Sequence, residues 1–157
     1  MENMVVVGIS DMKITCVPNL LITYALGSCV GICLYDYGTK IAGLSHILLP
    51  ESQIYSGELN IMKYADTAIV ELIRLMVHSG ASQSRLTAKI AGGAQMFASS
   101  HIKIGQRNVE AVTVELQRLN IKIISNDTGD TYGRTLLFDP QNGAVTVKSI
   151  LRGNRII

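Results

Sequence analysis

The feature that most constrains the fold is a run of 22 residues without a charged side chain, from Ile14 to Tyr35. A helix of that length could span a bilayer. However, the run contains Pro18-Asn19, Gly27-Ser28 and Gly31, which are turn-forming residues. The sequence therefore predicts two or three buried strand-like pieces. With no basic segment typical of a signal peptide ahead of them, we expect a cytoplasmic protein that is not membrane-inserted.

Length and composition predict a single domain over residues 1–157. Hydrophobic residues make up 48% of the chain and charged residues 17%, which excludes a disordered chain or a highly charged coiled coil. Fourteen Lys and Arg residues stand against twelve Asp and Glu, no four basic residues are consecutive, and Trp is absent. The chain therefore lacks the basic and aromatic surface that binding of nucleic acid requires.

Two apolar segments around a turn predict a β-hairpin. Segments 29–36 and 40–48 flank the turn residues at 36–39, which read Asp-Tyr-Gly-Thr. If these four residues form the loop, Cys29 lies close to His46. A slip of one residue would instead turn His46 to the opposite face of the sheet.

The rest of the pattern predicts an α+β fold. Helical spacing of apolar residues indicates helices over 60–78, capped by Asn60 and followed by Gly80, and over 106–119. Further strands are expected at 4–8, 13–17, 86–91, 121–125, 134–138 and 144–150. We expect a mixed, largely antiparallel β-sheet or sandwich with two to three helices packed outside.

Cys29 is the candidate nucleophile. It follows Gly27-Ser28 at the entrance of a strand, where a thiol can be exposed and backbone N–H groups can converge as an oxyanion hole. Ionising an ordinary cysteine at pH 7 costs about 2 kcal/mol, and an imidazole that takes the proton removes that cost. With His46 nearby, Cys29 should then react with iodoacetamide below about pH 7.5. Alternatively, Cys29 has no catalytic role and is a small hydrophobic residue buried in the core.

Cys16 and Cys33 are expected to be core residues. The same hairpin register places Cys33 close to Ala42. The Cα atoms of Cys29 and Cys33 would be about 13 Å apart along the strand, which is too far for a disulfide or for a shared metal ion. A zinc site from Cys16, Cys29 and His46 stays open, although no C-x-x-C spacing supports it. The pair Gly92-Gly93 lacks the ending of a phosphate loop, so it predicts a tight turn or a close backbone approach.

Several motifs resemble the chemoreceptor glutamine deamidase family CheD. The first are Thr23 with Leu26-Gly27-Ser28-Cys29, and the segment at 43–50, GLSHILLP. The others, in order, are GGAQMF at 92–97, IGQRN at 104–108, Gly133-Arg134, and VTVK at 145–148. One departure is the sequence Asp127-Thr128-Gly129-Asp130, where the family usually has a paired glycine before Gly-Arg.

The resemblance implies a cysteine amidohydrolase that needs no cofactor or metal. Cys29 would be the nucleophile, His46 the general base and then acid, and Thr23 the residue that orients the imidazole, with Gly27 and Ser28 supporting the oxyanion. The implied reaction converts glutamines of a chemoreceptor's cytoplasmic helical bundle to glutamate through a thioester, with release of ammonia. Hydrolysis of glutamyl methyl esters is a possible additional activity.

The resemblance also implies a complex with the chemotaxis phosphatase CheC. A non-catalytic module that binds and regulates this phosphatase is the main alternative function. A thiol hydrolase acting on a small molecule is a third.

Overall fold

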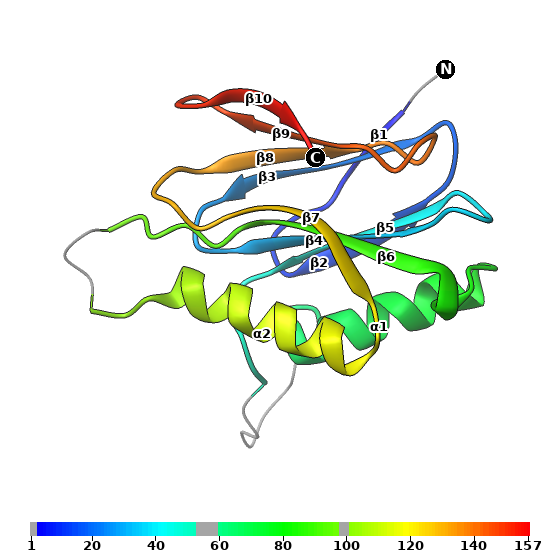
Figure 1. Cartoon of the computed structure of the whole chain (residues 1–157), viewed down its shortest axis with the longest axis horizontal. Helices are drawn as coiled ribbons and strands as arrows, with labels where there is room; N and C mark the ends of the chain where they lie inside the picture. The colour runs from blue at the N-terminus through cyan, green and yellow to red at the C-terminus, as the bar shows by residue number, and fades with distance from the viewer. Residues whose placement is uncertain (1–2, 53–59, 98–100) are drawn as a thin grey trace.

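The computed structural model describes residues 3–52, 60–97 and 101–157, which form two five-stranded sheets and two α-helices (Figure 1). The strands are β1 (Met4–Val6), β2 (Asp11–Thr15), β3 (Leu20–Leu26), β4 (Val30–Asp36), β5 (Ile41–Ile47), β6 (Leu86–Gly92), β7 (Lys122–Thr128), β8 (Arg134–Phe138), β9 (Val145–Ser149) and β10 (Gly153–Ile156). The helices are α1 (Ala65–His78) and α2 (Ile104–Arg118), and a 3₁₀ turn, η1, spans Gln83–Arg85.

The molecule has three layers. An outer sheet, in the order β1-β3-β8-β9-β10, lies over a central sheet, in the order β2-β5-β4-β6-β7, and both helices cover the free face of the central sheet (Figure 1). The expected α+β sandwich with helices outside is thereby confirmed. No helix among the described residues is long and apolar enough to cross a membrane. The uncharged run instead supplies the end of β2, all of β3 and most of β4.

The alternation of side chains in β4 explains its place at the centre. Val30, Ile32 and Leu34 pack in the cluster that the helices cover. Cys33 and Tyr35 pack in the cluster between the two sheets. Because both faces are covered, all seven residues of β4 are buried, as expected for a central strand.

The predicted hairpin is present, but its register differs from the expectation by two residues. Asp36 pairs with Ile41 and Gly31 with His46, so Cys33 lies opposite Leu44 and not opposite Ala42. The loop has four residues, as expected, but it lies at 37–40 and not at 36–39, because Lys40 adopts φ +58° and donates its N–H to the carbonyl of Asp36. A shift of two residues keeps every side chain on its predicted face.

Other boundaries differ for local reasons. The first helix begins at Ala65, five residues later than expected, because the backbone of Lys63 and Tyr64 is paired with Leu48 and Leu49. Asn60 does not cap the helix; its side chain accepts the N–H of Met62 in the preceding turn.

Two further expectations need correction. Cys16 is exposed and is not a core residue, because it begins the turn after β2, where its carbonyl accepts the N–H of Asn19. Strand β10 is absent from the sequence prediction, since all four of its residues are exposed and give no apolar pattern.

Candidate active site

Thr23 and His46 meet between the two sheets. Thr23 comes from β3 of the outer sheet and His46 from β5 of the central sheet, and neither side chain is exposed. The hydroxyl Oγ1 of Thr23 lies 2.7 Å from Nδ1 of His46 and also donates to the carbonyl of Val7, at 2.7 Å. Thr23 therefore lies within hydrogen-bond distance of the imidazole.

These two hydrogen bonds determine the tautomer of His46. The Thr23 hydroxyl has one proton, and it goes to the Val7 carbonyl, which can only accept. The Thr23 oxygen must then accept from His46, so Nδ1 carries the imidazole proton and Nε2 is left as the basic nitrogen. Nε2 is buried and has no hydrogen-bond partner among the described residues. A base with a free lone pair is thus held on the face between the sheets.

Cys29 lies immediately before β4, on the same face as His46. It packs in the cluster between the sheets, and His46 is paired with Gly31, two residues further along the chain. Cys29 and His46 are therefore diagonal neighbours, for which about 7–8 Å is usual in a sheet, and not directly opposite as the sequence suggested. No hydrogen bond joins them in the part of the chain that the structure describes.

Burial sets the charge of both groups. Cys29 is 6% exposed, although its position at a strand entrance suggested an open thiol. Burial raises the pKa of the Cys29 thiol, an effect that its own backbone N–H partly offsets. Burial also lowers the pKa of His46 to about 4. The resting pair at neutral pH is a neutral thiol and a neutral imidazole, in contrast to the thiolate–imidazolium pair that the sequence suggested.

Three consecutive carbonyls hold the turn that carries Cys29, here called the nucleophile turn (Gly27–Cys29). The carbonyl of Gly27 accepts the N–H of Ala94, and the carbonyl of Cys29 accepts the N–H of Gly93, each at 2.8 Å. Gly92 has φ +110°, and a Cβ there would collide with the carbonyl of Cys29. The prediction of a close backbone approach at Gly92-Gly93 is confirmed.

The third carbonyl bonds a residue that the sequence analysis did not single out. Asn108 on α2 is fully buried, and its Nδ2 donates to the carbonyls of Ser28, at 2.9 Å, and Leu48, at 3.0 Å. Asn108 is part of the quoted IGQRN motif. The signal that could have identified it is a polar residue at a helical position facing the core.

A small cavity adjoins the nucleophile turn. Its volume is about 110 Å³, and Ser28, Met96, Phe97 and Ile102 contribute to its lining. Cavities that bind free ligands usually measure about 300–1,000 Å³. This one is smaller, and neither Cys29 nor His46 lines it, so it lies beside the candidate catalytic residues and not around them.

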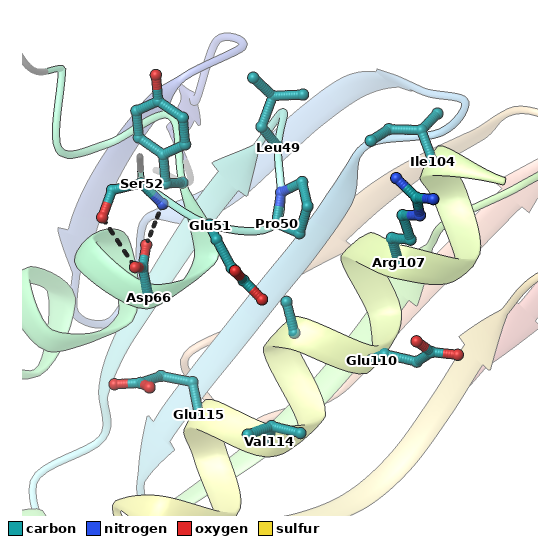
Figure 2. A pocket seen from close by; sticks show the side chains of 12 residues that line it. Leu49, Pro50, Glu51, Ser52, Asp66, Ile104, Arg107, Glu110, Val114 and Glu115 are labelled. Atoms are coloured by element: carbon teal, nitrogen blue, oxygen red, sulfur yellow. Dashed lines mark hydrogen bonds between the residues drawn. The ribbon is translucent and has the colours of Figure 1, made fainter. Parts of the chain in front are cut away.

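A larger groove of about 830 Å³ lies elsewhere, along α2 (Figure 2). Glu51, Arg107 and Glu110 line it, and at one end Asp66 accepts hydrogen bonds from the backbone and side chain of Ser52. Neither Cys29 nor His46 contributes to its lining. The groove is therefore separate from the candidate catalytic residues.

Comparisons with known proteins agree on one family. The family described as "CheD chemotactic sensory transduction" matches residues 48–149. A protein of Syntrophomonas wolfei, named "Probable chemoreceptor glutamine deamidase CheD", is 50% identical, with all of both chains covered. A protein of Bacillus licheniformis, named "Chemoreceptor glutamine deamidase CheD", is 43% identical over 94% of this chain and 90% of its own. This chain belongs to the CheD family.

The CheD family match at 48–149 begins after Thr23, Cys29 and His46, so it does not itself cover the three candidate residues. The alignment with the Syntrophomonas CheD protein runs through them, because it covers the whole chain. The assignment of these three residues therefore depends on the geometry described above.

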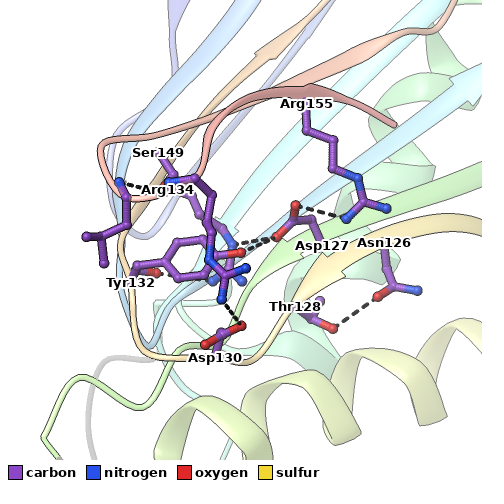
Figure 3. Close-up of polar contacts among 10 residues, drawn as sticks. Asn126, Asp127, Thr128, Asp130, Tyr132, Arg134, Ser149 and Arg155 are labelled. Carbon is purple, nitrogen blue, oxygen red and sulfur yellow. Dashed lines mark hydrogen bonds and ion pairs between the residues drawn. The ribbon is translucent and has the colours of Figure 1, made fainter.

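The departure from the CheD pattern at residues 127–130 lies in a polar network (Figure 3). Asp127 forms a buried ion pair with Arg134, at 2.8 Å, and the Arg134 guanidinium stacks on the ring of Tyr132, 4.2 Å from its centroid. Asp130 has φ +62°, a left-handed conformation that glycine favours. The carbonyl of Asp130 nevertheless accepts the N–H of Gln95, so the backbone contact to the segment after Gly93 is kept.

Proposed function

We propose that this chain hydrolyses the side-chain amide of specific glutamines in a chemoreceptor, producing glutamate and ammonia in the cytoplasm. The observation that carries the proposal is the bond between Thr23 and His46, which leaves a basic Nε2 on the face that Cys29 shares. The names of the related CheD proteins support the same substrate class.

The first half-reaction forms a thioester. The Cys29 thiol passes its proton to Nε2 of His46 as its sulfur attacks the glutamine carboxamide carbon, so no stable thiolate is needed beforehand. The imidazolium then protonates the departing nitrogen, the C–N bond breaks, and ammonia leaves. Rotation of the Cys29 side chain toward His46 must accompany substrate binding, because catalytic hydrogen bonds are often incomplete in the free enzyme.

The second half-reaction consumes water. His46 removes a proton from a water molecule, the hydroxide attacks the thioester carbon, and the C–S bond breaks. The sulfur recovers a proton from the imidazolium, and the product is a glutamate side chain. Thr23 holds the imidazole ring in one orientation through both halves.

Each half-reaction passes through an oxyanion that needs hydrogen-bond donors. The N–H of Gly27 is used, since it donates to the carbonyl of Ala25 at 3.1 Å. This narrows the proposed donors to the N–H groups of Ser28 and Cys29, with Gly27 supporting the turn.

The decisive experiment incubates a chemoreceptor cytoplasmic fragment with the protein and maps Gln→Glu conversion by mass spectrometry. Wild type should convert defined glutamines with a gain of about one dalton each, while Cys29→Ala should convert none. Cys33→Ala is the matched control, because Cys33 is a buried thiol on the same face that the mechanism does not use. Conversion by Cys29→Ala would show that another residue is the nucleophile.

The same experiment addresses the alternative of a binding module. If wild type converts no glutamine in any receptor fragment but binds the phosphatase CheC, regulation of that phosphatase becomes the function. Under our proposal Cys29→Ala loses conversion and keeps CheC binding, because the substitution removes one sulfur from a turn whose carbonyls stay bonded. A fragment carrying glutamyl methyl esters tests the additional esterase activity.

A further inference from the structure

Asn108 lies on α2, yet it bonds both chain segments that carry the proposed catalytic residues. Ser28 immediately precedes Cys29, and Leu48 follows His46 by two residues. The chemistry of its two partners fixes the orientation of the Asn108 amide, because two carbonyl oxygens can only be faced by the NH₂ end. Oδ1 is buried with no hydrogen-bond partner among the described residues, so the donor end makes the contacts.

These bonds lie where the sheet can no longer align the segments. The pairing of β4 with β5 ends at Val30 and Ile47, so Ser28 and Leu48 are both beyond the last paired residues. The Asn108 amide connects the two segments at this point and ties them to α2. The two hydrogen bonds of Asn108, here called the clamp, therefore hold the two segments together at the open end of the hairpin.

The bond to Ser28 also determines where an N–H group points. The carbonyl of Ser28 and the N–H of Cys29 belong to the same peptide unit, which is planar and trans. In a trans peptide unit the C=O and N–H bonds point in opposite directions. The Asn108 amide, which fixes the direction of the Ser28 carbonyl, therefore also fixes the direction of the Cys29 N–H. In the preceding peptide unit the Ala94 N–H bonds the carbonyl of Gly27, and this bond fixes the direction of the Ser28 N–H in the same way.

We propose that Asn108 is a positioning residue for the deamidation reaction: by holding the Ser28 carbonyl, it aims the Cys29 N–H at the oxyanion. The inference rests on the proposed function, because it concerns the oxyanion of that reaction. Without the clamp the Ser28 carbonyl loses a hydrogen bond, so the Ser28–Cys29 peptide can tilt between its two bonded neighbours and the oxyanion loses a prearranged donor. Loss of one such donor typically lowers kcat by about 10²–10³-fold.

The test compares two reactions of the same sulfur. Deamidation of a receptor fragment passes through an oxyanion, whereas alkylation of Cys29 by iodoacetamide is a displacement at carbon and forms none. For Asn108→Ala we expect kcat for deamidation to fall about 10²-fold with KM within about twofold, and Cys29 alkylation to stay within about twofold of wild type. Gln117→Ala, an exposed position on the same helix, is the control and should match wild type in both reactions.

Other outcomes separate the explanations. If alkylation and deamidation fall together, Asn108 only maintains the fold or the thiol's position, and the inference is wrong. It is equally wrong if Asn108→Ala keeps full kcat while Cys29→Ala is inactive. If Cys29→Ala itself remains active, the proposed function has failed first.

Two further measurements cover the possibility that Asn108→Ala does not fold. Asn108→Leu has nearly the same shape and fills the same space without a donor, so it should show the same split between the two reactions. In wild type, a peptide bearing the aldehyde analogue of glutamine should add Cys29 as a hemithioacetal and shift the Cys29 amide proton resonance downfield. An unmoved Cys29 resonance in the adduct would show that this N–H does not bond the oxygen.

Discussion

The hydroxyl of Thr23 and the imidazole of His46 form a 2.7 Å hydrogen bond that joins the outer sheet to the central sheet. Each residue is fully buried, and each belongs to a different layer of the sandwich. The candidate base is therefore oriented only when the two sheets are packed together. This relationship makes activity a sensitive measure of the packing between them.

Replacing Thr23 with Val should lower the deamidation rate by about tenfold to hundredfold, the range seen when a residue that orients a histidine is lost. Val keeps the shape of Thr23 but cannot accept the Nδ1 proton. Thr23→Ser keeps the hydroxyl and should retain most of the activity. Initial rates of ammonia release from a receptor fragment measure the effect, and equal rates for Val and Ser would refute the role of the hydroxyl.

The alkylation of Cys29 should depend on pH in the way that a buried thiol requires. Because burial raises the pKa of Cys29, iodoacetamide should modify it slowly at pH 7.5 and faster as the pH rises above about 8.5. The exposed thiol of Cys16 is an internal control for the reagent. Mass spectrometry of the two peptides over a pH series gives both rates. Rapid modification of Cys29 at pH 7 would instead indicate a preformed thiolate.

The folded state should lose stability as the pH falls from about 6.5 to about 4. Burial lowers the pKa of His46 to about 4, so in this range the unfolded chain binds a proton that the folded chain does not. At pH 5 this group alone should cost about 2 kcal/mol of unfolding free energy relative to pH 7.5. Urea denaturation of wild type and His46→Gln measures the difference. If the two proteins lose equal stability between these pH values, His46 is not the cause.

Asp36 should be among the most important polar residues for stability. Its side chain is buried, accepts the N–H groups of Gly38 and Ser82, and pairs with Arg85 at 2.8 Å, which holds the pKa of the carboxyl well below its usual range. Asp36→Ala should lower the unfolding free energy by about 1–3 kcal/mol, because the N–H groups of Gly38 and Ser82 lose their charged acceptor, whereas the half-exposed Arg85 can turn to solvent.

Glu71→Ala provides the comparison for Asp36, since its pair with Arg74 is on the exposed side of α1. This substitution should change the unfolding free energy by less than about 1 kcal/mol. Denaturation at pH 7 measures both variants, and similar losses for the two would contradict the assignment of Asp36.

Asp130 should tolerate substitution by glycine and resist substitution by alanine. Asp130 has φ +62°, and Asp130→Gly relieves the strain of this left-handed conformation. The substitution gives up only a loose ion pair with Arg152, at 3.6 Å. We expect a gain in stability of up to about 1 kcal/mol. Asp130→Ala keeps the Cβ in that conformation without the polar side chain that helps aspartate to tolerate it, so it should be no more stable than wild type. Thermal unfolding of both variants is the measurement, and a destabilising glycine would show that the ion pair dominates.

The sequence predicted those elements whose side-chain pattern is local. The two apolar segments around a turn identified β4 and β5, and the helical period identified α1 and α2. The hairpin register was not predictable in this way, because it depends on the left-handed backbone of Lys40, which no pattern marks.

In the candidate site, too, local patterns could be predicted from the sequence and long-range contacts could not. Cys29 and His46 were predicted from the Gly27-Ser28 turn and the hairpin, but Thr23 only through the resemblance to a family, because the contact between Thr23 and His46 joins two sheets that local periodicity cannot place together. The contribution of Asn108 was missed, since its partners lie 80 and 60 residues away in the chain. Buried polar residues reveal such long-range roles only when their partners are known.

The fully bonded carbonyls of the nucleophile turn have a consequence for substrate choice. The main chain at Gly27–Cys29 cannot shift to follow an incoming peptide, so the receptor has to deliver its amide to a fixed point. A glutamine that is held against its own helix by neighbouring side chains would not reach the sulfur, even with a favourable surrounding sequence. Which glutamines are converted then depends on the freedom of each side chain on the receptor surface.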